Sequence, residues 1–343
     1  MHEILGIIAF GLIGLAYFIY LVQEIPTIGV GILNIFIAPT KEEKRRLQLI
    51  SGLYSDGIEV WLIVAVGLTF AAFPAAFGSI FSGIYVPAFL LLIALIFRGL
   101  SVELLFKDDH PKWLKYMSLA WSISGMLLMF VLGVYIVNLF TGFPYENGSM
   151  GTNIFAIFTT ASLSGGILMI VLALIMGSVW IKFNRLEQLS EKAFKLIKKY
   201  GLIYAVPFLF AIILMGINNN VVSIVSNQLF SANPYLLALP LASLLFFILM
   251  TLFGHLKKAP WLYGSFVLGL LLFFASGFLG TYPYVLFSKV AFSEGMLIKD
   301  AMASETALVV MSVVVLIVLP VVLLYQGHKY LYFFRKDKEN HGS

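Results

Sequence analysis

Long stretches of apolar sequence without charge recur along this chain and constrain its fold more than any other feature. Each is about 20 residues long or longer, the length that an α-helix needs to cross the hydrocarbon core of a membrane. They cover residues 4–22, 58–76, 79–98, 115–140, 153–181, 200–219, 234–254, 261–282 and 306–333. Because the stretches are continuously apolar rather than alternating, we predict an all-α integral membrane protein with nine transmembrane helices, not a β-barrel.

The distribution of basic residues predicts the orientation of these helices. Of the 22 Lys and Arg residues, all but Lys289 and Lys299 fall in alternate loops or in the C-terminal tail. Loops rich in Lys and Arg stay in the cytoplasm. We therefore expect the N-terminus outside and the C-terminus in the cytoplasm, as an odd number of spans requires. The net charge of +5 then reflects this bias and contact with anionic lipid headgroups, not a nucleic-acid partner.

The chain is expected to form a single polytopic membrane domain over residues 1–343, because the spans leave no room for a sizeable soluble domain. A first helix bundle is predicted over 1–182 and a second bundle plus the last helix over 201–343. Between them, 183–200 has the pattern of a short amphipathic helix at the inner membrane face. The first span should end near Gln23, since Glu24 and Pro26 interrupt it, and continue as a kinked, shallow segment through Gly31.

Few ionisable residues lie within or beside the spans, and such residues tend to mark ion paths or partner contacts. Glu24, Asp56, Glu59 and Arg98 all fall toward the cytoplasmic leaflet. Asp56 and Glu59 are three residues apart, so they share one helix face and could take in protons from the cytoplasm. A structural interpretation stays open beside this one, in which Asp56 caps the second helix and Glu59 pairs with Arg98.

The histidines and other potential metal ligands of the sequence argue against a redox centre in this chain. The five histidines lie at helix ends, in loops or at the termini, whereas a haem within the bilayer needs a buried imidazole ligand. No cysteine is present, which excludes disulfides and iron–sulfur clusters, and the carboxylates have no metal-ligand spacing. We expect no catalytic, cofactor-binding or metal-binding residue here. The small residues of 159–166 favour close helix packing over a polar path.

One block of sequence carries a family resemblance. Asp56-Gly57-Ile58-Glu59-Val60-Trp61-Leu62 continues to Phe70-Ala71-Ala72-Phe73-Pro74, and Phe81-Ser82-Gly83-Ile84-Tyr85 and Phe97-Arg98-Gly99 follow. This order and spacing is similar to subunit II of the cytochrome bd-type quinol oxidases, and Gly29-Val30-Gly31 and Pro320-Val321-Val322 extend the similarity toward both ends. Three features depart from the family pattern: Thr27 replaces a second acid, Ser55 replaces an aromatic residue, and Val102-Glu103-Leu104-Leu105 replaces a Phe-Arg-like ending.

The resemblance implies a fold, partners and a role. The fold would be two four-helix bundles plus one peripheral helix, in the bacterial cytoplasmic membrane. The partner would be a haem-bearing subunit I with b- and d-type haems that oxidises quinol and reduces dioxygen to water, with a possible small accessory membrane subunit. This chain would bind no haem, would help the haem subunit assemble and would contribute to proton uptake. Asp56 would start the proton path, with Glu24, Glu59 and Arg98 beside it.

Two other functions are kept open from the sequence. A secondary transporter would show inverted repeats and matched helices interrupted by Gly or Pro, and we see no matched pair. A purely structural scaffold would stabilise its partner without moving protons. Mutation of the acidic residues would separate the scaffold from the proton path.

Overall fold

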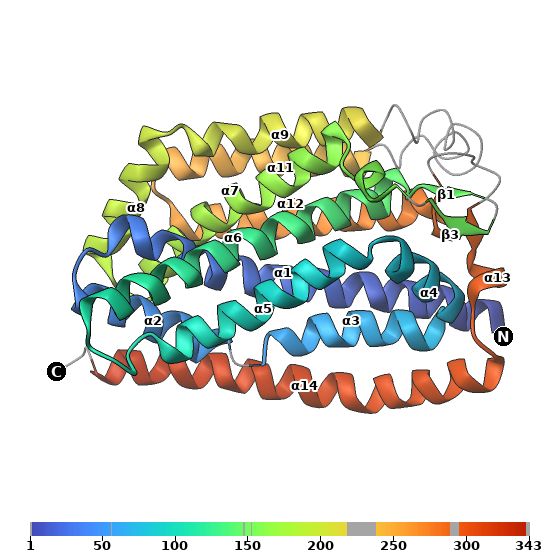
Figure 1. Ribbon diagram of the computed structural model, residues 1–343, viewed down its shortest axis with the longest axis horizontal. Helices are drawn as coiled ribbons and strands as arrows, with labels where there is room; N and C mark the ends of the chain where they lie inside the picture. Colours follow the sequence, from blue (N-terminus) through green and yellow to red (C-terminus); the bar gives the residue numbers. More distant parts are fainter. Residues whose placement is uncertain are drawn as a thin grey trace.

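Helices lying side by side along one long axis form the body of the protein (Figure 1). The computed structural model describes residues 2–55, 57–146, 148–151, 153–217, 238–288 and 295–340. Its helices are α1 (His2–Ile37), α2 (Lys41–Ser55), α3 (Glu59–Ala72), α4 (Pro74–Gly83), α5 (Tyr85–Leu104), α6 (Pro111–Thr141), η1 (Ile154–Ile157), α7 (Thr160–Phe183), α8 (Glu187–Lys199), α9 (Leu202–Ile217), α11 (Ala238–His255), α12 (Ala259–Thr281), α13 (Ile298–Ala301) and α14 (Glu305–Asn340).

Two short antiparallel hairpins and one isolated parallel bridge between Phe143 and Ser288 make up the β-structure of the described residues. Strand β1 (Tyr145–Glu146) pairs with β2 (Ser149–Met150), and β3 (Tyr284–Leu286) pairs with β4 (Met296–Leu297). Both hairpins lie at the end of the molecule where the N-terminus is found (Figure 1). The predicted all-α class is therefore confirmed, with the hairpins confined to connections between helices.

In the described part of the chain, seven helices are long and apolar enough to cross a membrane on their own: α1, α5, α6, α7, α11, α12 and α14. The number rises to as many as nine if each of two bent helix pairs forms one span. Helices α3 and α4 meet at 120°, and α8 and α9 meet at 55°. Each of the nine predicted stretches overlaps one of the helices, but nine complete crossings and the two four-helix bundles stay predictions.

The predicted spans 58–76 and 79–98 are wrong in their bounds. Helix α3 ends at Ala72, and α4 begins at Pro74 after Phe73, whose φ and ψ are −134° and 63°. Proline disfavours the helical conformation in the residue before it and has no N–H to continue the hydrogen-bond ladder. The next long helix, α5, then begins only at Tyr85.

Helix α1 also differs from the prediction, because it does not end near Gln23. It runs without interruption to Ile37, and residues 24–34 are buried rather than spread along a membrane surface. Pro26 lies inside the helix and leaves the carbonyl of Val22 without its usual helical donor. The hydroxyl of Tyr263 on α12 donates to that carbonyl at 3.3 Å, so a neighbouring helix replaces the missing bond.

Glycines allow the central helices to approach closely. A Cβ added to Gly29 on α1 would lie 1.7 Å from the carbonyl oxygen of Ala173 on α7, and Gly177 meets the same part of α1 from the other side. A Cβ added to Gly133 on α6 would lie 2.4 Å from the carbonyl oxygen of Gly165. The small residues near 165 therefore serve packing, as the sequence favours. Helix α1 lies at the centre, packed against α3, α6 and α7.

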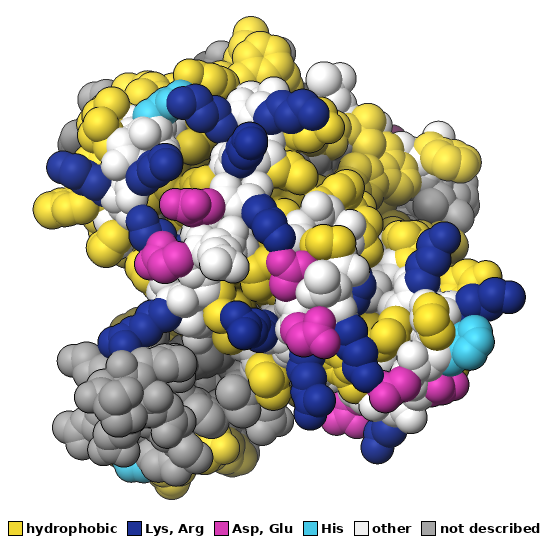
Figure 2. Space-filling model, turned by 90° about the vertical axis from the view of Figure 1, so that its left-hand side faces the viewer, with side chains coloured by type: hydrophobic (Ala, Val, Ile, Leu, Met, Phe, Trp, Pro, Cys, Tyr) yellow, Lys and Arg dark blue, Asp and Glu magenta, His cyan; other side chains and the backbone are white. Residues whose placement is uncertain are grey.

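The two ends of the molecule differ in charge. The termini lie at opposite ends (Figure 1), and Figure 2 shows Lys and Arg side chains gathered over the end that carries α2, α8 and the turn before α6. Helix α8, the predicted amphipathic helix, turns Leu189, Ala193 and Ile197 into the core. Lys192 on its exposed face pairs with Glu43 of α2 at 2.5 Å. One end of the helix bundle is thus polar and basic, as the loop pattern predicts.

Candidate functional site: a Glu–Arg–Glu cluster

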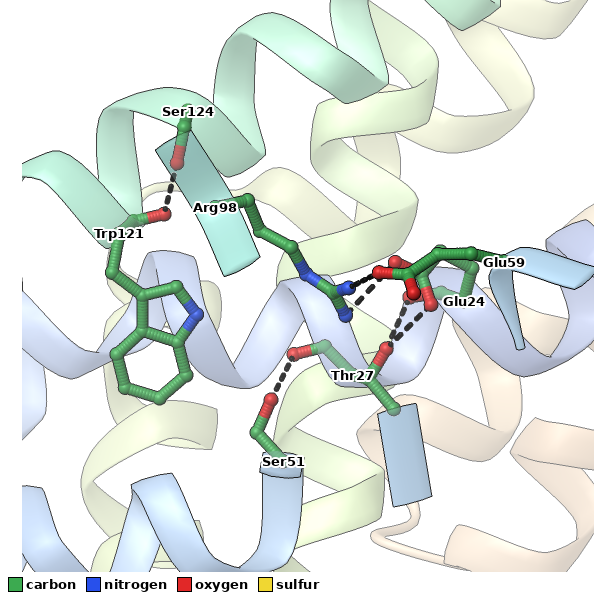
Figure 3. A network of polar contacts seen from close by, with 7 residues as sticks. All are labelled: Glu24, Thr27, Ser51, Glu59, Arg98, Trp121 and Ser124. Atoms are coloured by element: carbon green, nitrogen blue, oxygen red, sulfur yellow. Dashed lines mark hydrogen bonds and ion pairs between the residues drawn. The ribbon is translucent and has the colours of Figure 1, made fainter. Parts of the chain in front are cut away.

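Three helices bring together three of the four predicted ionisable residues. Glu24 comes from the middle of α1, Glu59 is the first residue of α3, and Arg98 lies in the last third of α5 (Figure 3). Arg98 Nη1 donates to Glu59 Oε1 at 2.5 Å, and Arg98 Nη2 lies 2.9 Å from Glu24 Oε1. One guanidinium therefore bridges two carboxylates that are 35 positions apart in the chain.

Burial differs sharply across the cluster. The side chains of Glu24 and Arg98 are 0% and 3% exposed, whereas that of Glu59 is 43% exposed. Two ionised carboxylates and one guanidinium carry a net charge of −1, and burying a net charge is unfavourable. The cluster becomes neutral when it holds one proton. It can therefore accept and release a proton while Arg98 stays charged.

Neighbouring hydroxyl groups orient Glu24. Thr27 Oγ1 lies 3.1 Å from Glu24 Oε2 and 2.9 Å from the Glu24 carbonyl oxygen, so its single proton serves two acceptors. Ser51 of α2 donates in turn to the Thr27 carbonyl at 3.3 Å (Figure 3). Thr27, which departs from the family pattern, is therefore a direct hydrogen-bonding neighbour of the buried acid.

Asp56, the predicted start of the proton path, lies outside the described residues, as does the side chain of Ser55. The next residue, Gly57, has a positive φ of 84°, a conformation that glycine adopts without strain. Gln326 of α14 donates to the Gly57 carbonyl at 3.2 Å and accepts from Trp61 Nε1 at 2.9 Å. Helix α14 thus contacts the described start of this segment at Gly57 and Trp61.

The structural interpretation of these residues is confirmed in one respect. Glu59 does pair with Arg98, as that interpretation requires. The N-cap of α3 is Ile58, which makes no side-chain capping bond. A proton role for the pair stays a prediction, because an ion pair is compatible with both interpretations.

The described residues do not fit a haem site. Of the four described histidines, His2, His110 and His255 lie at helix ends and His328 lies within α14, and none of the four is buried. Axial ligation of haem within a bilayer would need a buried ring. Within the described ranges, no group of three or more His, Cys, Asp or Glu side chains is arranged to hold a metal ion.

Sequence reasoning missed three polar residues around the cluster: Tyr20, Thr27 as a donor, and Ser51. Tyr20 is fully buried one helical turn from Glu24. A signal was present, because Tyr20, Glu24 and Thr27 are spaced by four and three residues and so lie on one face of a helix. The expected end of the helix near Gln23 concealed that spacing.

Comparison with known proteins identifies relatives over nearly the whole chain. The profile of the family "Cytochrome bd terminal oxidase subunit II" matches residues 5–333. Cytochrome bd ubiquinol oxidase subunit 2 of Bacillus subtilis is 30% identical over 90% of this chain and 89% of its own length. Cytochrome bd-I ubiquinol oxidase subunit 2 of Escherichia coli K12 is 25% identical over 99% of this chain and 97% of its own.

A solved structure has the same fold. A chain of the bd oxidase from Geobacillus thermodenitrificans superposes with a TM-score of 0.75 at 19% identity. The match covers 96% of this chain and 99% of the other.

Proposed function

The chain belongs to the family of subunit II of the cytochrome bd terminal oxidases, and we propose that it conducts protons from the cytoplasm toward the oxygen-reducing subunit of such a complex. It is a component of an oxidoreductase complex of the respiratory chain and a multi-pass protein of the bacterial plasma membrane. The secondary-transporter alternative is set aside by this membership.

The haem groups and their partner belong to the same proposal. A bd oxidase complex uses haems and quinol, and membership implies a subunit I. We assign the b- and d-type haems and the oxidation of quinol to that subunit, because no described histidine of this chain is buried. This chain would assist its assembly, and a small accessory subunit could join them. The basic end of the helix bundle would face the cytoplasm.

The observation that carries the proton proposal is the sharing of Arg98 between Glu24 and Glu59. Oxygen reduction to water consumes protons, which have to reach a site within the membrane. Glu59 is half-exposed and Glu24 fully buried, so the cluster joins an accessible carboxylate to an enclosed one. With one proton bound the cluster is neutral, which removes the cost of a buried net charge. Asp56, three residues before Glu59, would supply the cluster from the cytoplasm.

Glu24→Gln tests this proposal in the purified complex. The amide keeps the size of the side chain and removes its ability to bind and release a proton. We expect quinol oxidase turnover to fall about tenfold or more, which corresponds to an activation barrier higher by at least roughly 1.4 kcal/mol. The haem content, read from the visible spectrum, should persist. Asp56→Asn should act in the same direction.

Glu43→Gln is the matched control. Glu43 is also an ion-paired carboxylate, but its partner Lys192 is near the protein surface. Its substitution should leave turnover within about twofold, because exposed pairs contribute little. Full turnover in both Glu24→Gln and Asp56→Asn would leave the scaffold function as the better account.

A further inference from the structure

One face of α1 is polar from its centre to its cytoplasmic end. Residues at intervals of three and four lie on one face of a helix. The residues on this face are Tyr17, Tyr20, Glu24, Thr27, Gly31 and Asn34, and every one of them is buried. Such a row in a membrane-spanning helix has to be hydrogen-bonded by its neighbours or by water, because lipid offers neither donors nor acceptors.

Helix α2 covers the cytoplasmic half of this face with polar groups. Lys44 Nζ lies 3.4 Å from Asn34 Oδ1, and Ser51 donates to the Thr27 carbonyl at 3.3 Å. Lys44 is half-buried, and burial lowers its pKa, with an opposing contribution from the charge of Glu43. The row therefore has polar neighbours from the protein surface to the buried cluster.

Helix α6 covers the other side of the row. Asn34 Nδ2 donates to the Ser118 carbonyl at 3.2 Å, and Ser122 donates to the Gly31 carbonyl at 2.7 Å. At Gly31 the indole of Trp121 fills the space, since a Cβ there would lie 2.5 Å from Trp121 Nε1. Figure 3 shows the nitrogen edge of this indole turned toward the side on which the Arg98 guanidinium lies.

Several buried polar atoms along this row have no hydrogen-bond partner among the described residues. They are Ser118 Oγ, Trp121 Nε1, Arg98 Nε and Tyr20 Oη. An unpartnered buried donor or acceptor is destabilising, so native proteins satisfy such atoms with another protein group or with internal water. The four atoms follow the row from the level of Asn34, past Arg98, to one turn beyond Glu24. Internal water molecules placed along this row would give all four atoms a hydrogen-bond partner.

We propose that α1, α2 and α6 enclose a hydrated seam from Lys44 and Asn34 to Tyr20, and that it delivers protons to Glu24 independently of Asp56 and Glu59. This inference rests on the proposed function of the cluster. Each water in the seam accepts a proton on one side and releases one on the other, so charge moves without any change of oxidation state. Glu24 then has two sources of protons: Glu59 through the shared guanidinium site, and the seam from the side of α6.

The test blocks the seam in the complete oxidase complex. Asn34→Leu keeps the volume of the side chain and removes its polar groups from the mouth of the seam. Asn138→Leu is the matched control, because Asn138 is equally buried on α6 and donates to the Ile157 carbonyl at 2.9 Å, away from the row. Each substitution is combined with Glu59→Gln, and proton uptake is followed with a pH indicator dye after mixing the reduced complex with oxygen.

The seam predicts that Asn34→Leu slows the residual uptake of the Glu59→Gln complex by about tenfold, whereas Asn138→Leu changes it less than about twofold. Trp121→Phe, which removes only the indole N–H and one ring, should also lower it. Trp121→Phe should also remove infrared bands of weakly hydrogen-bonded internal water. If Asn34→Leu does not assemble, Trp121→Phe decides the question in the same background.

Two results would overturn the seam. The first is unchanged uptake in Asn34→Leu while uptake in Glu24→Gln is slow. If Asn34→Leu does not assemble, Trp121→Phe takes its place in this comparison. This result rejects the seam and leaves the proposed function standing. Unchanged uptake in Glu24→Gln rejects delivery to Glu24 by any route, and with it proton transfer through the Glu24–Arg98–Glu59 cluster.

Discussion

Arg98 is the residue on which the cluster depends, because it supplies the positive charge to two carboxylates. The three ionisable residues could be picked out from the sequence, since charges are rare within apolar stretches. Their contacts could not be predicted in full, because Glu24 and Arg98 are 74 positions apart and meet only through the packing of α1 against its neighbours. The donor role of Thr27 was missed for a different reason, because the expected end of the first helix near Gln23 separated Thr27 from its acceptor Glu24.

Charge balance at Arg98 gives a prediction about stability. Arg98→Met should leave the buried Glu24 carboxylate without a cation, which typically costs about 3–5 kcal/mol. We expect a strong loss of assembled, haem-containing complex and a lower melting temperature. The double variant with Glu24→Gln should recover much of both, because the uncompensated charge is gone.

Recovery in the double variant is the decisive comparison, measured by haem content per protein and by thermal unfolding of the purified complex. A double variant as unstable as Arg98→Met alone would contradict the charge account. Such a result would mean that Arg98 stabilises the complex through its packing and not through its charge.

At the scale of the elements, α1 organises both the core and the site. Continuous apolar length predicted most of the long helices, but not where α1 and α3 end. Pro26 is tolerated within α1 because Tyr263 of α12 replaces a lost hydrogen bond, whereas Pro74 ends α3. In both cases the local signal is a proline within an apolar stretch. The surrounding helices decide whether the helix continues through that proline.

Gly29→Ala tests the close contact of α1 with α7. A Cβ at Gly29 would lie 1.7 Å from the Ala173 carbonyl oxygen, and neither atom can turn away, because the Cβ is fixed by the α1 backbone and the oxygen belongs to the α7 backbone. Overpacking at such a site should cost about 3 kcal/mol or more. The control is Gly11→Ala, also within α1, where nothing lies within 4 Å of the new methyl group.

The melting temperature of the complex is compared between the Gly29→Ala and Gly11→Ala variants. Gly11→Ala should leave it unchanged or raise it slightly, because alanine favours helix by about 1 kcal/mol over glycine. Equal melting temperatures for the two variants would show that α1 and α7 are farther apart than described here.

At the scale of the whole molecule, the charge of the two ends is the property that the sequence predicted best. That prediction required only the alternation of basic loops with nearly uncharged loops along the sequence, and no knowledge of contacts between distant residues. The division into two bundles and the count of nine crossings depend on how bent helices such as α3 and α4 sit in the membrane, which apolar length alone does not determine.

The orientation can be tested cleanly because the chain has no cysteine. Ser149→Cys, exposed in the hairpin near the N-terminal end, should react with a membrane-impermeant maleimide in intact spheroplasts. Lys195→Cys, exposed on α8 at the basic end, should react only after permeabilisation. Labelling in the opposite pattern would reverse the orientation and place the mouth of the seam outside the cell.

The most direct test of the central claim is the rate of proton uptake by the Glu24→Gln complex after the reduced enzyme meets oxygen. The account predicts uptake slowed about tenfold or more, with the haem spectrum of the unmodified complex. Uptake at the unmodified rate, with haem intact, would contradict proton transfer through the cluster.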